Sequence, residues 1–530
     1  MIAQPPMINA APPLRTGDRA AVTALTAAAA MLLFSDLGHK SAFVDEAYHV
    51  GWASMPALEL VRATVDEFHP PLYLLLLHAW MTVAGTSDTA ARIPAALFGI
   101  LLVPLAYGIG RELGGGRHGM WAAAFVALSP PIFFYSRVAM WYSFATFLGT
   151  LSTWTFLRLR RPEAPPWTWT THAIASALLC YTHYLAAAVV LPGQQIMLWL
   201  TPAESLAFRR RWRRHVVIIS AVFVPWVVMV VRHQLAAMRP HGYHPSALSV
   251  TDVLLSWLYW PYAVTVGETV LPWTLAFVPL ALGAVVVLAN AGRAVARDQA
   301  VRAWTVAFLL VPLAWSPLLL RTFGFTFLAM PYHLLPLVPA WSVVAAAGQA
   351  EASGWRWRVG LVTVVAIFVV SGIAYWRDSA TANPVLSVPW KSVAELVTSR
   401  RGRDDVVLIA AEGNFQAGQV LGRYLSRPYA LVRETGIDQA LSSVATRNPD
   451  VVWLVSEPAF SPATPLLRDR IGRSHILDRR QGFKPTDPVA RALKERLFAR
   501  LSPWAWPAPA TEFAVVVERY VRRPPGRGSP

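Results

Sequence analysis

The sequence predicts a polytopic α-helical membrane protein, with about eleven spans, that ends in a small C-terminal α/β soluble domain. Of its 530 residues, 55% are hydrophobic and only 15% are charged, whereas a soluble chain carries about 25% charged residues. Apolar runs of membrane-spanning length recur from about Ala21 to Tyr375, since a spanning helix needs roughly 20 such residues. The remainder, Trp390 to Arg522, has the composition of a soluble domain.

Eleven apolar segments fit membrane spans. They lie near residues 20–37, 93–110, 119–135, 139–157, 168–181, 185–201, 216–231, 273–291, 303–320, 332–349 and 359–376. The first follows Arg15 and Arg19, as the apolar part of a signal peptide would. No small-residue cleavage site comes after it, so we expect it to be a retained span.

Lysine and arginine favour alternate connections between these spans, and this bias sets the orientation. The basic-rich set comprises Arg15, Arg19, Arg111, Arg117, Arg158, Arg160, Arg161, Arg209–Arg214, Arg293, Arg297, Arg302, Arg356 and Arg358. The positive-inside rule makes this set cytoplasmic. The odd number of spans then places the C-terminal domain on the external, periplasmic side of the inner cell membrane.

The predicted parts follow one another along the chain. They are a cytoplasmic tail 1–19, a transmembrane region 20–376 with a long external loop 38–92, a linker 377–389, an external α/β domain 390–521 and a disordered tail 522–530. In the external domain, short β-branched runs predict strands at Asp405–Ala411, Val451–Ser456 and Ala514–Glu518, and Ser392–Arg400 predicts a helix.

Charge and cysteine content exclude nucleic-acid binding as a function and cysteine-based cross-links or metal sites as structural features. The formal charge of +17, from 47 basic and 30 acidic residues, is explained by the short basic clusters between spans. Nucleic-acid binding is excluded because no basic stripe carries interleaved aromatic residues. Cys180 is the single cysteine, so an intrachain disulfide and a cysteine-based metal site are excluded as well.

The external loop 38–92 concentrates polar residues at the predicted membrane surface. Asp45 and Glu46 form an acidic pair, and Asp45, Tyr48 and His49 have the i, i+3, i+4 spacing that places them on one face of a helix. Acidic residues also favour the first turn of any helix, so a solvated helix start is the alternative. Asp45 and His49 alone are too few ligands for a metal.

A second motif in this loop is His69-Pro70-Pro71. Proline is favourable at a helix start, so the motif predicts a helix over Leu72–Val83 with His69 at its N-terminal end. A helix N-terminus attracts anions, and His69 could add a donor there. An acidic pair and an anion-binding helix start at the bilayer surface together suit a reaction on a membrane-bound phosphate ester.

These motifs resemble the GT-C glycosyltransferases of the protein O-mannosyltransferase and aminoarabinose-transferase (family 39-like) group. There, an Asp or Asp-Glu in the first external loop precedes a [His/Lys]-Pro-Pro-Leu-Tyr-like segment, matched here by Asp45-Glu46 and His69–Tyr73. Further matches are Ala91–Ala96, Gly110–Gly115, Ser129-Pro130, Tyr135-Ser136, Tyr181–Tyr184 and Trp390-Lys391. The resemblance covers the chain loosely and Asp45 to Tyr142 most tightly.

The resemblance implies an inverting transfer of a hexose or pentose from a polyprenyl-phosphate donor to an acceptor hydroxyl of an unknown glycan, lipid or protein. Asp45 would be the general base, with Glu46 orienting the site or sharing that role. His69, with Arg92 or Arg137, would stabilise the departing phosphate. Substrate-binding roles fall to Tyr48, His49, Tyr73, Tyr142 and His183. No cofactor and no metal is expected, and the remaining partners are membrane lipids.

One departure keeps other functions open. Val138 and Met140 stand where many relatives carry an acidic and a basic residue. Arg92 and Arg137 could equally anchor helices at the lipid head groups. A transporter or flippase of lipid-linked substrates, and a non-catalytic membrane scaffold, are therefore alternatives. A transporter predicts ionisable residues at mid-bilayer and corresponding halves, and the sequence shows few of the former and none of the latter.

Overall fold

The structure of the chain is a computed structural model. It describes residues 16–524 except 67–68, 162–163, 203–204, 238–259, 267–268, 271–273, 316–330, 378–387, 411–416, 427, 458–460, 462 and 484–514. Most of the predicted tail 1–19, linker 377–389 and tail 522–530 therefore lies outside the described residues. The chain forms two compact units, one of Met1–Leu37 and Val50–Ile373, the other of Gly38–His49 and Ala374–Pro530.

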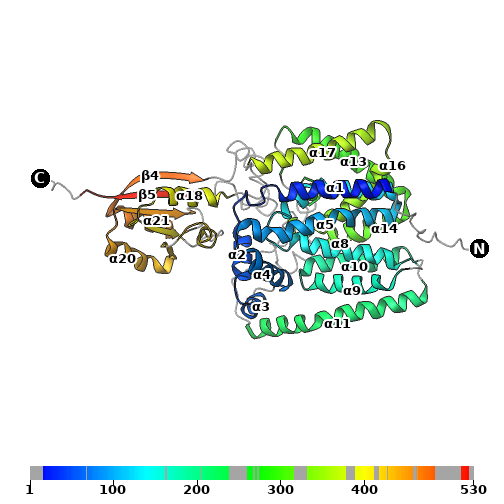
Figure 1. The fold of residues 1–530 in the computed structure, drawn as a ribbon, viewed down its shortest axis with the longest axis horizontal. Coiled ribbons are helices and arrows are strands. Elements are labelled where there is room, and N and C mark those ends of the chain that lie inside the picture. The colour runs from blue at the N-terminus through cyan, green and yellow to red at the C-terminus, as the bar shows by residue number, and fades with distance from the viewer. Residues whose placement is uncertain are drawn as a thin grey trace, which may run out of the picture. The chain divides into compact units, whose positions relative to one another are not determined.

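The first unit is a bundle of helices, several of which run side by side (Figure 1). Its helices are α1 Thr16–Phe34, α3 Ala57–Asp66, α4 Leu72–Ala84, α5 Asp88–Gly114, α6 Gly116–Ala127, α7 Pro130–Tyr135, α8 Tyr142–Leu159, α9 Pro166–Cys180, α10 Tyr184–Leu200, α11 Leu206–Ala237, α13 Phe277–Arg297, α14 Gln299–Thr305, the π-helical η1 Val306–Leu310, the 3₁₀ turn η3 Pro331–Leu334, α16 Leu337–Glu351 and α17 Gly354–Trp376.

Every apolar segment predicted to span the membrane contains helix. Among the described residues, five helices are long and apolar enough to cross a bilayer, namely α1, α5, α11, α13 and α17. The number of crossings stays a prediction. The segment predicted as one span over 119–135 is two helices, α6 and α7, because Pro130 stops the first and the Ser129 hydroxyl caps the second by accepting from the Ile132 amide.

Small residues bring the central helices close together. α5 packs on α6, which in turn packs on α16. Where α5 crosses α6, a Cβ atom added to Gly119 would lie 2.6 Å from the Tyr107 carbonyl oxygen, and one added to Gly110 would lie 2.9 Å from the Gly119 Cα atom. Such close backbone approach is typical of packing between membrane helices.

The second unit contains a five-stranded mixed sheet of order β2-β1-β3-β5-β4. Its strands are β1 Val406–Ala410, β2 Ala430–Val432, β3 Val451–Ser456, β4 His475–Phe483 and β5 Val515–Arg522. β1 pairs in parallel with β2 and β3, whereas β5 pairs antiparallel with β3 and β4. β1, β3 and β5 coincide with the three strands expected from the sequence.

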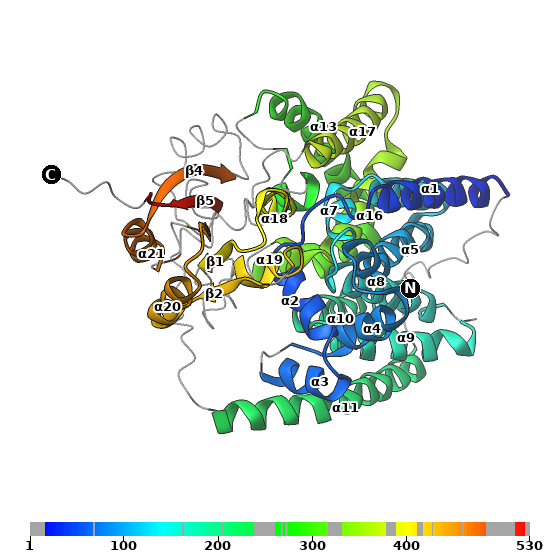
Figure 2. The same ribbon diagram turned by 60° about the vertical axis from the view of Figure 1, so that its left-hand side comes forward.

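Helices cover both faces of this sheet (Figure 2). α18 Trp390–Arg400 and α19 Ala417–Leu421 share one apolar core with it, and α20 Ile437–Arg447 and α21 Ala463–Gly472 share the other. β1 and β3 are buried along their whole length, as expected of strands covered on both faces.

Candidate functional site

The predicted acidic pair lies on a short helix, α2 Val44–Ala53. Val44, Ala47 and Tyr48 pack into the core formed by α18, α19 and the sheet of the second unit. On a helix with 3.6 residues per turn, Asp45 then lies beside Tyr48 at the flank of this packed face, and His49 lies farther from it. Residues Gly38–His49 thus group with the C-terminal domain, whereas the sequence assigned the whole of loop 38–92 to the membrane region.

Asp45 has the properties of a proton acceptor near neutral pH. Part of its surface is exposed to solvent, and partial desolvation by the surrounding protein raises the pKa of Asp45 to about 6. His49 donates through Nδ1 to the Asp45 carbonyl oxygen at 2.8 Å. Glu46 and His49 are both buried. An accessible carboxyl that titrates near 6 suits general base catalysis.

The His-Pro-Pro motif begins α4 as expected. Pro71 precedes the first turn of α4, and His69 is half-buried beside the edge of Trp52. The Leu72 amide, one of the free donors at the start of α4, donates to the Tyr181 carbonyl oxygen at 3.1 Å. This bond joins the His-Pro-Pro motif to Tyr181–Tyr184, two segments of the first unit that the sequence picked out separately.

His183 connects this junction to a histidine that the sequence did not single out. Its Nδ1 atom caps α10 by accepting from the Ala186 amide at 3.2 Å, so its proton is on Nε2. That Nε2 lies 3.2 Å from Nδ1 of His333, on η3, and donates to it. His183 also stacks on Trp141, with ring centroids 3.6 Å apart. Burial lowers the pKa of His183, and the neighbouring His333 and His69 lower it further.

Aromatic rings surround the two histidines. We call the group Tyr135, Trp141, Tyr142, His183, Tyr332 and His333 the aromatic–histidine cluster. Tyr142 packs on Tyr135, Trp141 and Tyr332 with centroid separations of 5.4, 4.6 and 4.9 Å. Tyr73 is buried and packs on Phe144. Five of the six rings are buried against one another, and Tyr332 is half-buried. Aromatic rings and neutral imidazoles are groups that suit a polar, uncharged ring such as a sugar.

Arg92 and Arg137 hold the end of α1. Both are buried, at 1% exposure. Arg92 donates to the Leu37 carbonyl oxygen at 3.0 Å. Arg137 donates to four carbonyl oxygens at 2.7–2.9 Å, those of Leu32, Leu33, Ser35 and Asp36. These carbonyls lie where α1 ends and would otherwise lack intrahelical donors. The contacts favour anchoring of α1, and phosphate binding by either arginine stays a prediction.

The predicted site residues thus fall into three groups, which lie in different parts of the fold. His69, Tyr142 and His183 come together in the first unit, Arg92 and Arg137 serve α1, and Asp45, Glu46, Tyr48 and His49 belong to the second unit. Sequence reasoning missed Trp141, Tyr332 and His333. Trp141 lies between two noted tyrosines, and Tyr332-His333 is a polar pair after Pro331 at the start of a predicted span. These sequence contexts are the signals that could have identified both positions.

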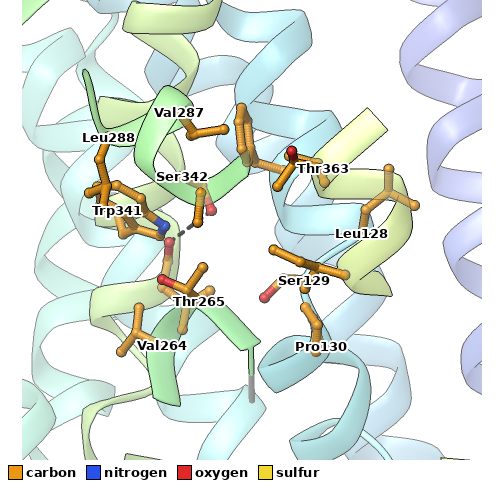
Figure 3. Close-up of a pocket in the computed structure, with 15 residues that line it drawn as sticks. Leu128, Ser129, Pro130, Val264, Thr265, Val287, Leu288, Trp341, Ser342 and Thr363 are labelled. Atoms are coloured by element: carbon orange, nitrogen blue, oxygen red, sulfur yellow. Dashed lines mark hydrogen bonds between the residues drawn. The ribbon is translucent and has the colours of Figure 1, made fainter. Parts of the chain in front are cut away.

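An apolar pocket of about 70 Å³ opens elsewhere in the first unit (Figure 3). Val287, Trp341 and Ile367 are among the side chains that line it from α13, α16 and α17. Two of its lining hydroxyls donate to nearby backbone, Thr265 to the Pro261 oxygen and Ser342 to the Val338 oxygen. Most of the lining side chains are apolar, and the pocket is small beside the roughly 300–1,000 Å³ of a whole-ligand site.

Among the described residues, no group of three or more His, Cys, Asp or Glu side chains is placed to hold a metal ion.

Comparison with known proteins defines the class. The family model described as dolichyl-phosphate-mannose-protein mannosyltransferase matches residues 68–229. No curated protein matches the chain. Of the solved structures, ArnT from Cupriavidus metallidurans bound to undecaprenyl phosphate has a TM-score of 0.57 at 13% identity, over 94% of this chain and 97% of that chain. ArnT in the apo state has a TM-score of 0.56 at 12% identity, over 86% of this chain and 95% of that chain.

The class is thus that of membrane proteins with a GT-C glycosyltransferase fold, and the resemblance inferred from the motifs is confirmed. Over nearly the full length of both chains, the fold is that of ArnT.

Proposed function

We propose that this protein is a membrane glycosyltransferase that moves a sugar from a polyprenyl phosphate to an acceptor hydroxyl. The observation that carries the proposal is an accessible carboxyl, Asp45, whose pKa is raised to about 6, in a chain with the fold of ArnT. The donor class is supported by the ArnT structure that holds undecaprenyl phosphate.

The proposed reaction is a single displacement with inversion at the anomeric carbon. The acceptor oxygen forms a bond to C1 of the sugar while the bond from C1 to the phosphate oxygen breaks, and that oxygen keeps the electron pair. Asp45 takes the proton of the acceptor hydroxyl. Glu46 orients the acidic helix or shares the proton. The polyprenyl phosphate leaves as the anion, and Asp45 then releases its proton to water. No metal or cofactor enters this scheme.

The first unit supplies groups for the donor. His69, at the start of α4, donates to the departing phosphate, supported by the anion preference of a helix N-terminus. Tyr332, the half-buried member of the aromatic–histidine cluster, offers the sugar ring a stacking face. The apolar pocket in Figure 3 offers room for part of a lipid chain, because most of its lining side chains are apolar.

We place the acidic helix, the His-Pro-Pro motif and the C-terminal domain on the external side of the membrane, with the N-terminus in the cytoplasm. This orientation is supported by the arginines of the short loops. The acceptor is a glycan, lipid or protein hydroxyl on that side, and the transferred sugar is a hexose or a pentose.

The test is turnover with a panel of radiolabelled polyprenyl-phosphate sugars in proteoliposomes containing membrane-extract acceptors. We expect one donor to be consumed, and Asp45→Asn to lower turnover at least about 100-fold. Glu59→Gln is the matched control, since Glu59 is an exposed acidic residue of the same external loop. Equal release of sugar by wild type and Asp45→Asn, or movement of intact donor across the bilayer without its consumption, would refute the proposal.

A further inference from the structure

The segment before the acidic helix is bound to the C-terminal domain through its backbone. Lys391, at the start of α18, donates its amide to the Ser41 hydroxyl at 3.0 Å. Its Nζ atom donates to the carbonyl oxygens of Gly38 and, at 3.4 Å, of Lys40. Tyr424, after α19, accepts a hydrogen bond from the Ala42 amide through its hydroxyl at 2.8 Å. Four hydrogen bonds therefore hold residues Gly38–Ala42.

The two residues that make these bonds also contact each other. The Lys391 ammonium lies 5.7 Å from the centre of the Tyr424 ring, within the range of a cation–π interaction. Both side chains are only half-buried, and both stand beside the apolar core of the domain, which contains Trp390, Val393 and Leu425. The core fixes the elements that carry Lys391 and Tyr424.

The acidic helix itself is seated in that same core. Val44 and Ala47 are 7% and 6% exposed and pack with Trp390 and other side chains of α18, α19 and the sheet. Tyr48, one turn after Val44, packs against the same core. The helix is thereby fixed in rotation about its own axis, because a turn that moved Asp45 would take Val44 and Ala47 out of the core.

We propose that the C-terminal domain positions Asp45, with Lys391 and Tyr424 as the positioning residues. This inference rests on the proposed function, in which Asp45 is the general base. It assigns the domain a task in the chemical step. Neither residue touches the substrate in this scheme. Each acts by holding the backbone of Gly38–Ala42, from which α2 continues.

A small displacement of Asp45 should lower the rate strongly, because proton transfer requires a short distance between the base and the hydroxyl. A base must lie within hydrogen-bond reach of the hydroxyl it deprotonates, and a misplacement of about 1 Å can cost about 100-fold in rate. Loss of the Lys391 and Tyr424 bonds does not change the chemistry of the Asp45 carboxyl. It frees the backbone of Gly38–Ala42, so the start of α2 and Asp45 can shift with that segment.

The experiment compares Lys391→Met and Tyr424→Phe with wild type in the full-length, reconstituted protein. We expect kcat to fall about 10- to 100-fold, with the donor KM within about twofold of wild type. We also expect the midpoint of the acid limb of the pH–rate profile to move. Lys391→Arg should restore part of kcat because it keeps a cationic donor. Arg400→Met, at the exposed end of the same helix, is the control and should leave kcat unchanged.

A second measurement separates positioning from a general loss of structure. In the Asp45→Asn background, Lys391→Met should change the residual rate less than twofold, because both substitutions act through one group. Tyr424→Phe removes a single oxygen atom and serves where Lys391→Met lowers the yield of folded protein.

Each remaining outcome decides between the two proposals. If wild type consumes donor, Asp45→Asn does not, and both positioning variants keep the wild-type kcat and pH midpoint, the positioning inference fails and the proposed function stands. A raised donor KM at unchanged kcat would also overturn the inference, in favour of donor binding. If Asp45→Asn is as active as wild type, the proposed function fails, and this inference fails with it.

Discussion

The Nε2 atom of His183 lies 3.2 Å from the Nδ1 atom of His333, and the two imidazoles stack nearly in parallel, at 18°. The direction of this bond follows from the far side of His183, where Nδ1 accepts from the Ala186 amide. Each ring is then neutral, and the proton of His333 is on Nε2. One helix cap therefore sets the tautomers of both histidines.

This relationship predicts different effects for two substitutions of His183. His183→Asn keeps a side-chain oxygen that caps α10 but loses the donor to His333, whereas His183→Ala loses both. We expect His183→Ala to destabilise the fold by about 1 kcal/mol more than His183→Asn. Both should lower kcat/KM by at least about tenfold. Thermal unfolding in detergent and donor turnover measure the two effects. Equal melting temperatures for the two variants would show that the cap has no energetic role.

Arg137 gives a second prediction, because its guanidinium serves four carbonyl oxygens at the end of α1. Hydrogen bonds to charged groups contribute roughly 1.5–3 kcal/mol each, and buried carbonyls without donors are costly. We expect Arg137→Met to destabilise the first unit by at least about 3 kcal/mol, as measured by denaturant unfolding.

The control for Arg137→Met is Arg62→Met, at an exposed position on α3, which should change stability by less than about 0.5 kcal/mol. A variant of Arg137 with wild-type stability and a raised donor KM would favour the phosphate-binding role that the motif suggested.

The sequence predicted the helices well because their signal is local. Length and hydropathy alone mark each apolar segment, and Pro70-Pro71 marks the start of α4. β1 and β3 were equally visible as buried β-branched runs. β4 was missed because it is an edge strand with the mostly exposed sequence HILDRRQGF, which has no apolar alternation.

The site was less predictable, because its contacts join distant parts of the chain. His183 and His333 are 150 positions apart, and Lys391 bonds to a residue 350 positions before it. No periodicity or spacing reports such contacts. The grouping of Gly38–His49 with the C-terminal domain escaped the sequence for the same reason, since chain order alone assigned that segment to the loop between the first two predicted spans.

Asp45 predicts a specific dependence of stability on pH. Its pKa is about 6 in the folded protein against 3.8 for an unperturbed aspartate, so between these values the folded protein binds more protons than the unfolded chain. The free energy of unfolding therefore falls as pH rises through this window. Asp45→Asn removes this pH-dependent contribution to the free energy of unfolding. The variant should therefore melt at a higher temperature than wild type at pH 7.5 but not at pH 4.

The size of this difference is limited by the exposure of Asp45, because solvent screens the carboxylate. Glu59→Gln is again the control and should show no such change with pH. If the melting temperatures of wild type and Asp45→Asn differ equally at both pH values, the carboxyl titrates normally in the folded protein, and its selection as the general base loses its electrostatic support.

The crossing of α5 and α6 gives a last prediction, in which packing opposes helix propensity. Alanine is more favourable than glycine in a helix by about 1 kcal/mol. At Gly119, however, the new methyl group would lie 2.6 Å from the Tyr107 carbonyl oxygen and 3.1 Å from the Arg111 nitrogen. Both are backbone atoms of α5, which cannot move aside as a side chain can. We expect Gly119→Ala to destabilise the protein by about 1–3 kcal/mol.

Gly292→Ala, on α13 with no atom within 4 Å of the new methyl group, should leave stability unchanged or raise it. Thermal unfolding in one detergent measures the change in melting temperature of each variant relative to wild type. A decrease for Gly119→Ala alone would confirm the close packing of α5 and α6. Stabilisation by both substitutions would mean that α5 and α6 are farther apart in the folded protein than this crossing requires.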